Sequence, residues 1–163
     1  MEKKYSIPYS AWERLGFIKL TDGNEIDYDV IRADINIIAG DYGIEKMGVD
    51  RVFQGAQLCQ QLIKDGMIVE QINMSWFFFT APTREFERRV NAGLIVHGNN
   101  PVARFAANNA KIIQDNNGLM RPVKPTRDSH LKVDPIIVAV ISTMMAANET
   151  GNSIYETRGA LVF

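Results

Sequence analysis

The chain of 163 residues carries 18 basic and 19 acidic side chains and a single cysteine, and 46% of its residues are hydrophobic. This composition excludes a disordered tail, and a lone thiol excludes a disulfide framework or a multi-cysteine zinc site. The chain has no apolar run of the about 20 residues that a membrane helix needs, and no secretory signal. We therefore expect a soluble, intracellular single domain over residues 1–163.

In the first half of the chain, strand and helix patterns alternate. Residues 1–28 are interpreted as an edge strand from Trp12 to Leu20 followed by a turn. Apolar residues at helical spacing predict a helix over residues 30–38 that stops at Gly40 and Gly43. Three further elements follow: a strand over residues 44–49 that ends at Asp50, a helix over residues 52–65 closed by Gly66, and a strand over residues 67–72.

The second half continues this alternation as far as the last helix. Asn116-Asn117-Gly118 is a hairpin turn signal, because this pair of residue types tolerates positive φ. Asp134-Pro135 opens the last helix, with Asp134 as the predicted N-cap. The other predicted elements are a helix over residues 81–91, a strand over 94–97, a helix from Pro101 to about Ala110, hairpin strands over 111–115 and 119–123, a loop over 124–132, and the last helix ending near Asn148.

The alternation predicts an α/β domain with a partly parallel sheet, whose core covers residues 29–148. Residues 149–163 are expected to form a frayed tail. Residues 1–83 carry 8 basic and 12 acidic side chains, whereas residues 84–132 carry 9 and 4. A basic middle of this kind is either a surface that faces phosphate groups or an ordinary solvated face.

Two acidic residues stand where α/β domains collect ligands. Asp50 ends a predicted strand and Asp134 opens a helix, and if the helix packs beside that strand their carboxylates converge. Two close carboxylates need a cation to offset their repulsion, and their oxygens favour Mg²⁺ or Mn²⁺. Each residue also has an ordinary structural reading, because aspartate is common at helix caps and at turns.

Other reactive or aromatic residues have plain structural readings. His97 suits a histidine hydrogen-bonded to loop backbone, and His130 indicates nothing specific. Cys59 falls on an apolar helix stripe with Val52, Ala56 and Ile63, beside Leu58 and Leu62. The run from Trp76 to Phe79 is most simply core, and becomes a contact surface if it is exposed. The chain has neither of the glycine-rich nucleotide fingerprints, so no nucleotide is expected to bind by those routes.

Several short motifs appear in a recognisable order. Together they resemble the carboxyl-terminal nuclease domain of the large terminase subunit of tailed bacteriophages and prophages, over residues 7–148. The motifs are Ile7-Pro8-Tyr9 with Trp12, Thr21-Asp22-Gly23-Asn24, Met47-Gly48-Val49-Asp50-Arg51, the run His97-Gly98-Asn99-Asn100-Pro101-Val102-Ala103-Arg104, then Asn109, Lys124, and Lys132-Val133-Asp134 before a helix rich in alanine and methionine.

This resemblance implies an RNase H-like fold and metal-dependent cleavage of concatemeric double-stranded DNA during genome packaging. It implies that Asp50 and Asp134 are the catalytic acids and the ligands of a two-metal Mg²⁺ or Mn²⁺ site. From their charge and their place near Asp134, Lys124 and Lys132 are expected to face the DNA backbone, and Arg104 is a further candidate for DNA binding. The resemblance also implies a terminase small subunit and a portal as partners, in the cytoplasm of a bacterial host.

The chain departs from the family pattern at its start. The family's nuclease begins with a strand that carries a first catalytic acid, and no counterpart is recognised before Tyr5, so we expect a fold that is incomplete in its first central strands. Two carboxylates hold a two-metal centre poorly, so weak or no cleavage is expected from this chain alone. Without that strand, its neighbours expose hydrogen-bonding edges, which favours oligomerisation or strand exchange.

A second hypothesis belongs to another class of protein. The chain is then a catalytically incomplete remnant or a docking module, which contacts DNA or packaging-motor partners through the basic middle and the aromatic run. Metal binding distinguishes the two hypotheses, because only the nuclease needs a cation at Asp50 and Asp134.

Overall fold

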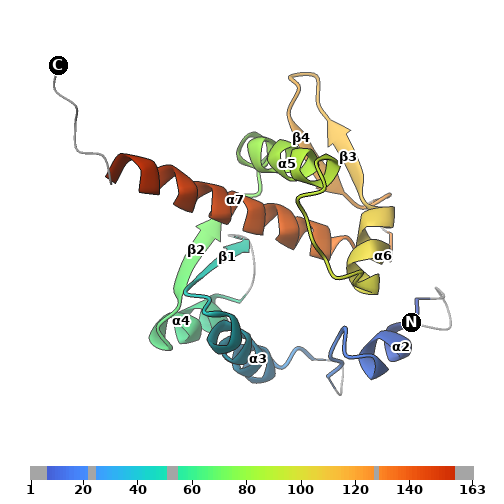
Figure 1. Cartoon of the computed structure of the whole chain (residues 1–163). Coiled ribbons are helices and arrows are strands. Elements are labelled where there is room, and N and C mark those ends of the chain that lie inside the picture. Colours follow the sequence, from blue (N-terminus) through green and yellow to red (C-terminus); the bar gives the residue numbers. More distant parts are fainter. Residues whose placement is uncertain (1–6, 22–24, 51–54, 127–128, 157–163) are drawn as a thin grey trace. The chain divides into compact units, whose positions relative to one another are not determined.

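The computed structural model describes residues 7–21, 25–50, 55–126 and 129–156 (Figure 1). The chain separates into two compact units, residues 19–74 and residues 1–18 together with 75–163. Each unit is described by itself, and the prediction of one domain over residues 1–163 stays a prediction. In the described part of the chain, no helix has the length and apolar character needed to cross a membrane.

The unit of residues 19–74 is built on a parallel strand–helix–strand crossover. The order of its elements confirms the predicted alternation, and β1 and β2 pair in parallel, with Lys46 opposite Ile68 and Asp50 opposite Ile72. Parallel strands need such a crossover, and α4 supplies it. The elements are α3 (Tyr28–Tyr42), β1 (Lys46–Asp50), α4 (Ala56–Lys64) and β2 (Ile68–Ile72).

The core of this unit is a small apolar cluster under α4. Leu58, Leu62 and Met67 are buried, and residues of α3 and of both strands pack against them. The predicted stripe of α4 is wrong in part, because Ala56 and Ile63 are exposed and only Cys59 is half-buried. The residues that face the core are the neighbouring pair Leu58 and Leu62. Val52, which also belonged to that stripe, lies outside the described residues.

A charged cluster ties α3 to the end of α4. The Arg32 guanidinium donates to both carboxylate oxygens of Asp65, and the Asn36 side-chain amide donates to Asp65 Oδ2 at 2.7 Å. These donors favour the ionised carboxylate and lower the pKa of Asp65 from 3.8 to about 2. The cluster therefore joins two helices that lie far apart in sequence.

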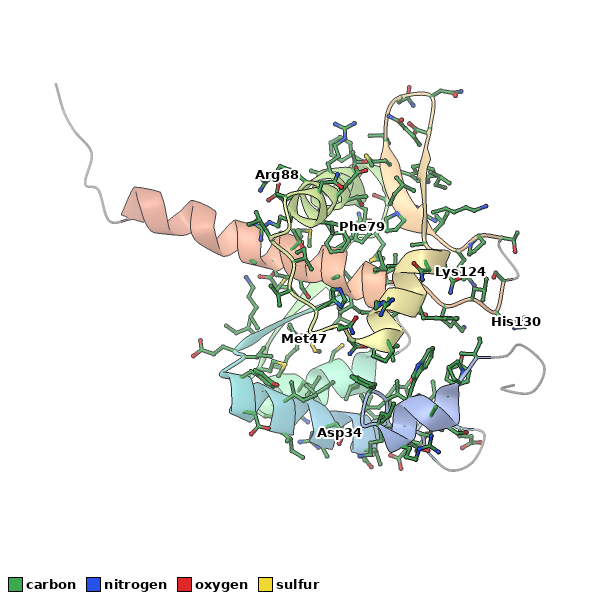
Figure 2. All side chains as sticks on the ribbon, turned by 45° about the vertical axis from the view of Figure 1, so that its right-hand side comes forward. Asp34, Met47, Phe79, Arg88, Lys124 and His130 are labelled. Atoms are coloured by element: carbon green, nitrogen blue, oxygen red, sulfur yellow. The ribbon has the colours of Figure 1, made fainter. Side chains whose placement is uncertain are left out.

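The second unit contains one long helix with two others packed on it. Both α5 and α6 contact α7, and α5 also contacts β4. Phe79, which is 1% exposed, lies on the side of α5 that faces α7 (Figure 2). The elements are α2 (Tyr9–Arg14), α5 (Trp76–Asn91), α6 (Pro101–Asn109), β3 (Lys111–Gln114), β4 (Met120–Val123) and α7 (Asp134–Glu156).

The predicted hairpin is confirmed. β3 and β4 are antiparallel, with Lys111 opposite Val123 and Gln114 opposite Met120. Gly118 has a φ of 78°, and the Asp115 carboxylate accepts from the main-chain N–H groups of Asn117 and Leu119. The last helix begins where it was predicted but continues to Glu156, beyond the expected end near Asn148. Residues 157–163 of the predicted tail lie outside the described residues.

The predicted edge strand from Trp12 to Leu20 is wrong. Residues 9–14 form the helix α2, whose Trp12 is buried and packs edge-on against Phe105 with ring centroids 5.3 Å apart. Gly16 has a φ of 76°, and the N–H groups of Gly16 and Phe17 donate to the carbonyls of Glu13 and Trp12. This pair of hydrogen bonds is a Schellman motif, which ends a helix at a glycine.

The same motif explains a second wrong prediction, the strand over residues 94–97. Gly93 has a φ of 67°, and the Leu94 N–H donates to the Arg89 carbonyl, so Leu94 belongs to the end of α5. Residues 94–97 have no regular secondary structure, and Leu94 and Val96 are exposed. Gly66 closes α4 in the same way, with Met67 N–H donating to the Leu62 carbonyl.

The helix predicted over residues 81–91 begins earlier, at Trp76. Pro82 lies inside it and cannot donate to the carbonyl of Phe78, which made the aromatic run look like a separate segment. Two threonines bond back to carbonyls one turn earlier in this stretch, since Thr80 Oγ1 donates to the Trp76 carbonyl at 2.6 Å and Thr83 Oγ1 donates to the Phe79 carbonyl at 2.7 Å. Tertiary packing of Phe79 outweighs the cost of the proline.

Two glycine substitutions in one unit should change stability in opposite directions. Gly66→Ala should lower the free energy of unfolding by about 1–2 kcal/mol, because the left-handed backbone at a φ of 100° is strained for alanine. Gly40→Ala should raise it by about 0.5–1 kcal/mol, because Gly40 lies inside α3 with open space around its Cα. Urea denaturation of both variants checks this, and destabilisation by Gly40→Ala would contradict it.

The Asp65 cluster should make stability depend on pH. Because the pKa of Asp65 is lowered in the folded chain, its contribution is complete above the ordinary pKa of 3.8 and is lost as the pH falls towards about 2. Between these two pH values, the free energy of unfolding should therefore fall more steeply with decreasing pH for the native chain than for Asp65→Asn. Asp41→Asn, which changes an exposed carboxylate of α3 outside the cluster, should behave like the native chain.

Candidate functional site

Asp50 is the last residue of β1, at the carboxyl edge of the parallel pair. It is half-buried and lies opposite Ile72, the last residue of β2. This edge is where α/β folds place binding and catalytic groups, because strand ends and the following loops meet there. The residues that directly follow it, 51–54, lie outside the described part of the chain. The structure thus places Asp50 where the sequence predicted it.

Asp134 lies at the start of α7, as predicted, but its role in the helix differs from the prediction. It is the first helical residue and not the N-cap, because the Val133 carbonyl already accepts from the N–H groups of Ile136 and Ile137. Its side chain is exposed. A carboxylate in the first turn interacts favourably with the helix dipole, so part of the role of Asp134 is to stabilise α7.

The two acids belong to different units, Asp50 to residues 19–74 and Asp134 to the other. That they converge stays a prediction. Carboxylate oxygens are the donors that Mg²⁺ and Mn²⁺ prefer, so the chemistry of this pair fits a hard cation. Within the described residues, no group of three or more histidine, cysteine, aspartate or glutamate side chains is placed to hold a metal ion.

The run from His97 to Arg104 forms a turn followed by a capped helix. Gly98 and Asn99 both have positive φ, at 55° and 56°, and the Asn100 N–H donates to the His97 carbonyl. Asn100 Oδ1 then accepts from the N–H groups of Val102 and Ala103, which caps α6. The glycine and the asparagines are required by this backbone, and the exposed His97 contributes its carbonyl.

Of the predicted DNA-facing residues, Lys132 is exposed and Lys124 is half-buried directly after β4 (Figure 2). Arg104 is exposed on α6, and its Nη1 donates to Asn99 Oδ1 at 3.0 Å. Arg104 therefore also stabilises the turn before α6. All three residues belong to the same unit.

Part of the basic excess in residues 84–132 is already engaged. Arg88 and Arg89 both donate to the Glu85 carboxylate, and these bonds lower the pKa of Glu85 from 4.5 to about 2. Arg84 donates through Nη2 to the Gly118 carbonyl at 2.9 Å, joining α5 to the hairpin turn. The guanidinium of Arg121 lies 5.2 Å from the centre of the Trp76 ring. The charge count in the sequence therefore overstates the free basic surface.

The aromatic run divides between core and surface. Phe79 is buried, Trp76 is half-buried, and Phe77 and Phe78 are 71% and 57% exposed. The rings of Phe77 and Phe78 meet edge to face, with centroids 5.3 Å apart. The helical period explains the division, because Trp76 and Phe79 are three positions apart and share one face of the helix, while the two residues between them face elsewhere. Sequence reasoning treated the run as one cluster and so missed this exposed pair.

Comparison with known proteins identifies the family. The family model described as "Terminase large subunit, endonuclease domain" matches residues 1–151, so the chain belongs to this family. It is 28% identical over 110 residues, 66% of its length, to the terminase large subunit of Enterobacteria phage HK97, and 22% identical over 136 residues, 82% of its length, to Protein YmfN of Escherichia coli (strain K12). The chain spans 22% and 29% of the lengths of these two relatives.

The fold is likewise found in a solved structure. The crystal structure of the HK97 bacteriophage large terminase aligns with a TM-score of 0.76 and 24% identity, over 87% of this chain and 29% of that chain. The predicted α/β, RNase H-like fold and the resemblance to the terminase nuclease domain are both confirmed. That the fold lacks its first central strands stays a prediction.

Proposed function

We propose that this chain is the endonuclease domain of a phage or prophage DNA-packaging terminase large subunit, and that within the whole subunit the domain cleaves concatemeric double-stranded DNA with Mg²⁺ or Mn²⁺ in the bacterial cytoplasm, whereas the chain alone cleaves weakly or not at all. The observation that carries this proposal is the match of the endonuclease family over residues 1–151. The place of Asp50 at the carboxyl edge of β1 supports it, because that edge suits a catalytic acid.

In this proposal Asp50 and Asp134 hold the metal, and the bound metal supplies an activated water and charge stabilisation. Each acid comes from a regular element, Asp50 from a paired strand and Asp134 from the first turn of α7. Rigid elements hold such ligands more accurately than loops do. Arg104, Lys124 and Lys132 contact the DNA backbone, and the terminase small subunit and portal are the packaging partners.

The metal site should be detectable by calorimetry. Mn²⁺ titrated into the native chain should bind with measurable heat, and Asp50→Asn and Asp134→Asn should each lower the affinity about tenfold or more, because each removes a charged oxygen ligand. Glu87→Gln, which removes one exposed carboxylate of α5, should bind as the native chain does.

Equal binding by the native chain and Asp50→Asn would contradict the metal site at that residue. It would favour the second candidate, a docking module without catalysis. The observation that favours this second candidate is the exposed pair Phe77 and Phe78, since large aromatic side chains in water are typical of contact surfaces. A plasmid-cleavage assay with Mn²⁺ measures nuclease activity separately from metal binding.

DNA binding should depend on the lysines of the second unit. Lys124→Ala and Lys132→Ala should each weaken binding of a DNA duplex and lower the dependence of log affinity on log salt by about one, because each removes one phosphate contact. Fluorescence anisotropy at several salt concentrations measures both quantities. Lys64→Ala, a change in the last turn of α4, serves as the control, and an equal effect there would contradict a specific DNA surface.

A further inference from the structure

The β3–β4 hairpin has one closed edge. β4 lies next to α5, and β3 lies on the far side of the hairpin (Figure 1). The Met120 N–H donates to Thr80 Oγ1 of α5 at 2.9 Å. Pro122, also on β4, has no N–H to offer. The edge of β4 that faces away from β3 is therefore unable to pair with another strand.

Hydrogen bonding within the hairpin shows which groups of β3 face outwards. The Asp115 N–H donates to the Leu119 carbonyl at 2.9 Å, so Asp115 bonds towards the β4 side. Hydrogen-bonded and non-hydrogen-bonded pairs alternate in antiparallel strands. Residues 113 and 111 therefore also bond to β4, and Ile112 and Gln114 direct their N–H and C=O groups away from it. Pro122 opposite Ile112 agrees with this alternation.

The outer edge of β3 is open. In the described part of its unit, β3 pairs with β4 and with no other strand. All four of its residues are exposed, including Ile112 at 47% and Ile113 at 36%. Proteins protect such an edge with a short strand, a charged side chain such as lysine, a proline, a bulge or a covering segment, and β3 has four residues and one lysine, Lys111. β4 has the proline and the cover, whereas β3 has neither.

We propose that the outer edge of β3 pairs with the same edge of a second copy of this chain. The two β3 strands run antiparallel about a two-fold axis at Ile113, which lies opposite Ile113 of the other copy. Ile112 then exchanges main-chain hydrogen bonds with Gln114 of the other copy, and Gln114 does so with Ile112. The result is a four-stranded sheet made from two hairpins.

Charge selects this register. With Ile113 on the two-fold axis, Lys111 lies opposite Asp115 of the other copy, on the same face of the sheet as the two isoleucines. Both hydrogen bonds that the Asp115 carboxylate accepts from Asn117 and Leu119 go to Oδ1, which leaves Oδ2 as the oxygen to accept from Lys111 of the other copy. A shift of two residues in either direction would separate these charges. The edge is therefore self-complementary in one register.

This association does not depend on nuclease activity, and analytical ultracentrifugation tests it. The native chain should form a concentration-dependent dimer. Ile112→Pro removes an outward N–H, leaves the bonds of residues 111 and 113 to β4, and should raise the dimer dissociation constant about tenfold or more. Lys111→Glu should also weaken the dimer, because it places two carboxylates opposite each other. Lys64→Glu, with the same charge change on α4, should leave it unchanged.

Cysteine cross-linking tests the register even if Ile112→Pro disturbs the hairpin. In a Cys59→Ser background, Ile113→Cys should oxidise to a covalent dimer, because a non-hydrogen-bonded antiparallel pair separates the Cα atoms by about 4.5 Å. Ile112→Cys should run as a monomer on a denaturing gel without reducing agent. The Cα atoms of the two residues at position 112 lie farther apart than the about 7 Å that a disulfide can span. A monomeric native chain, or equal cross-linking of both variants, would overturn the proposal.

Discussion

The unit of residues 19–74 depends on the burial of Leu58 and Leu62 between α4, α3 and the two strands. A pair of parallel strands is not stable by itself, because nothing covers its faces. α4 carries the chain from the end of β1 back to the start of β2, and its two leucines give the strands a core to pack on. This packing fixes the register in which Asp50 ends β1 beside Ile72, and so it places the acid on which the proposed function depends.

A Schellman motif ends helices in both units. Gly16, Gly66 and Gly93 each follow a helix with positive φ, and the residue after each glycine donates to a carbonyl one turn back. The apolar residue that follows the glycine is thereby directed towards its own helix. This explains why Phe17 and Leu94 were both assigned to strands when only their hydrophobicity was considered.

Several charged side chains form hydrogen bonds within the fold. Glu85 engages two arginines, Arg84 binds the hairpin turn, and Arg104 stabilises the turn that precedes α6. We propose that Lys124 and Lys132 are among the basic side chains that contact DNA. The hairpin shows a similar division, since α5 and Pro122 close one edge and leave the other for a partner.

The sequence by itself determined the helices, strands and turns whose signals are local. The Asn-Gly turn, the proline after Asn100, the alternation around Asp50 and the order of the family motifs each depend on neighbouring residues, and all were predicted correctly. The tertiary structure decided the rest. Burial of Trp12 against Phe105 turned an expected strand into α2, and packing of Phe79 on α7 extended α5 across Pro82. Contacts of this kind join residues distant in sequence, and their free energy outweighs the local preference that a pattern reports.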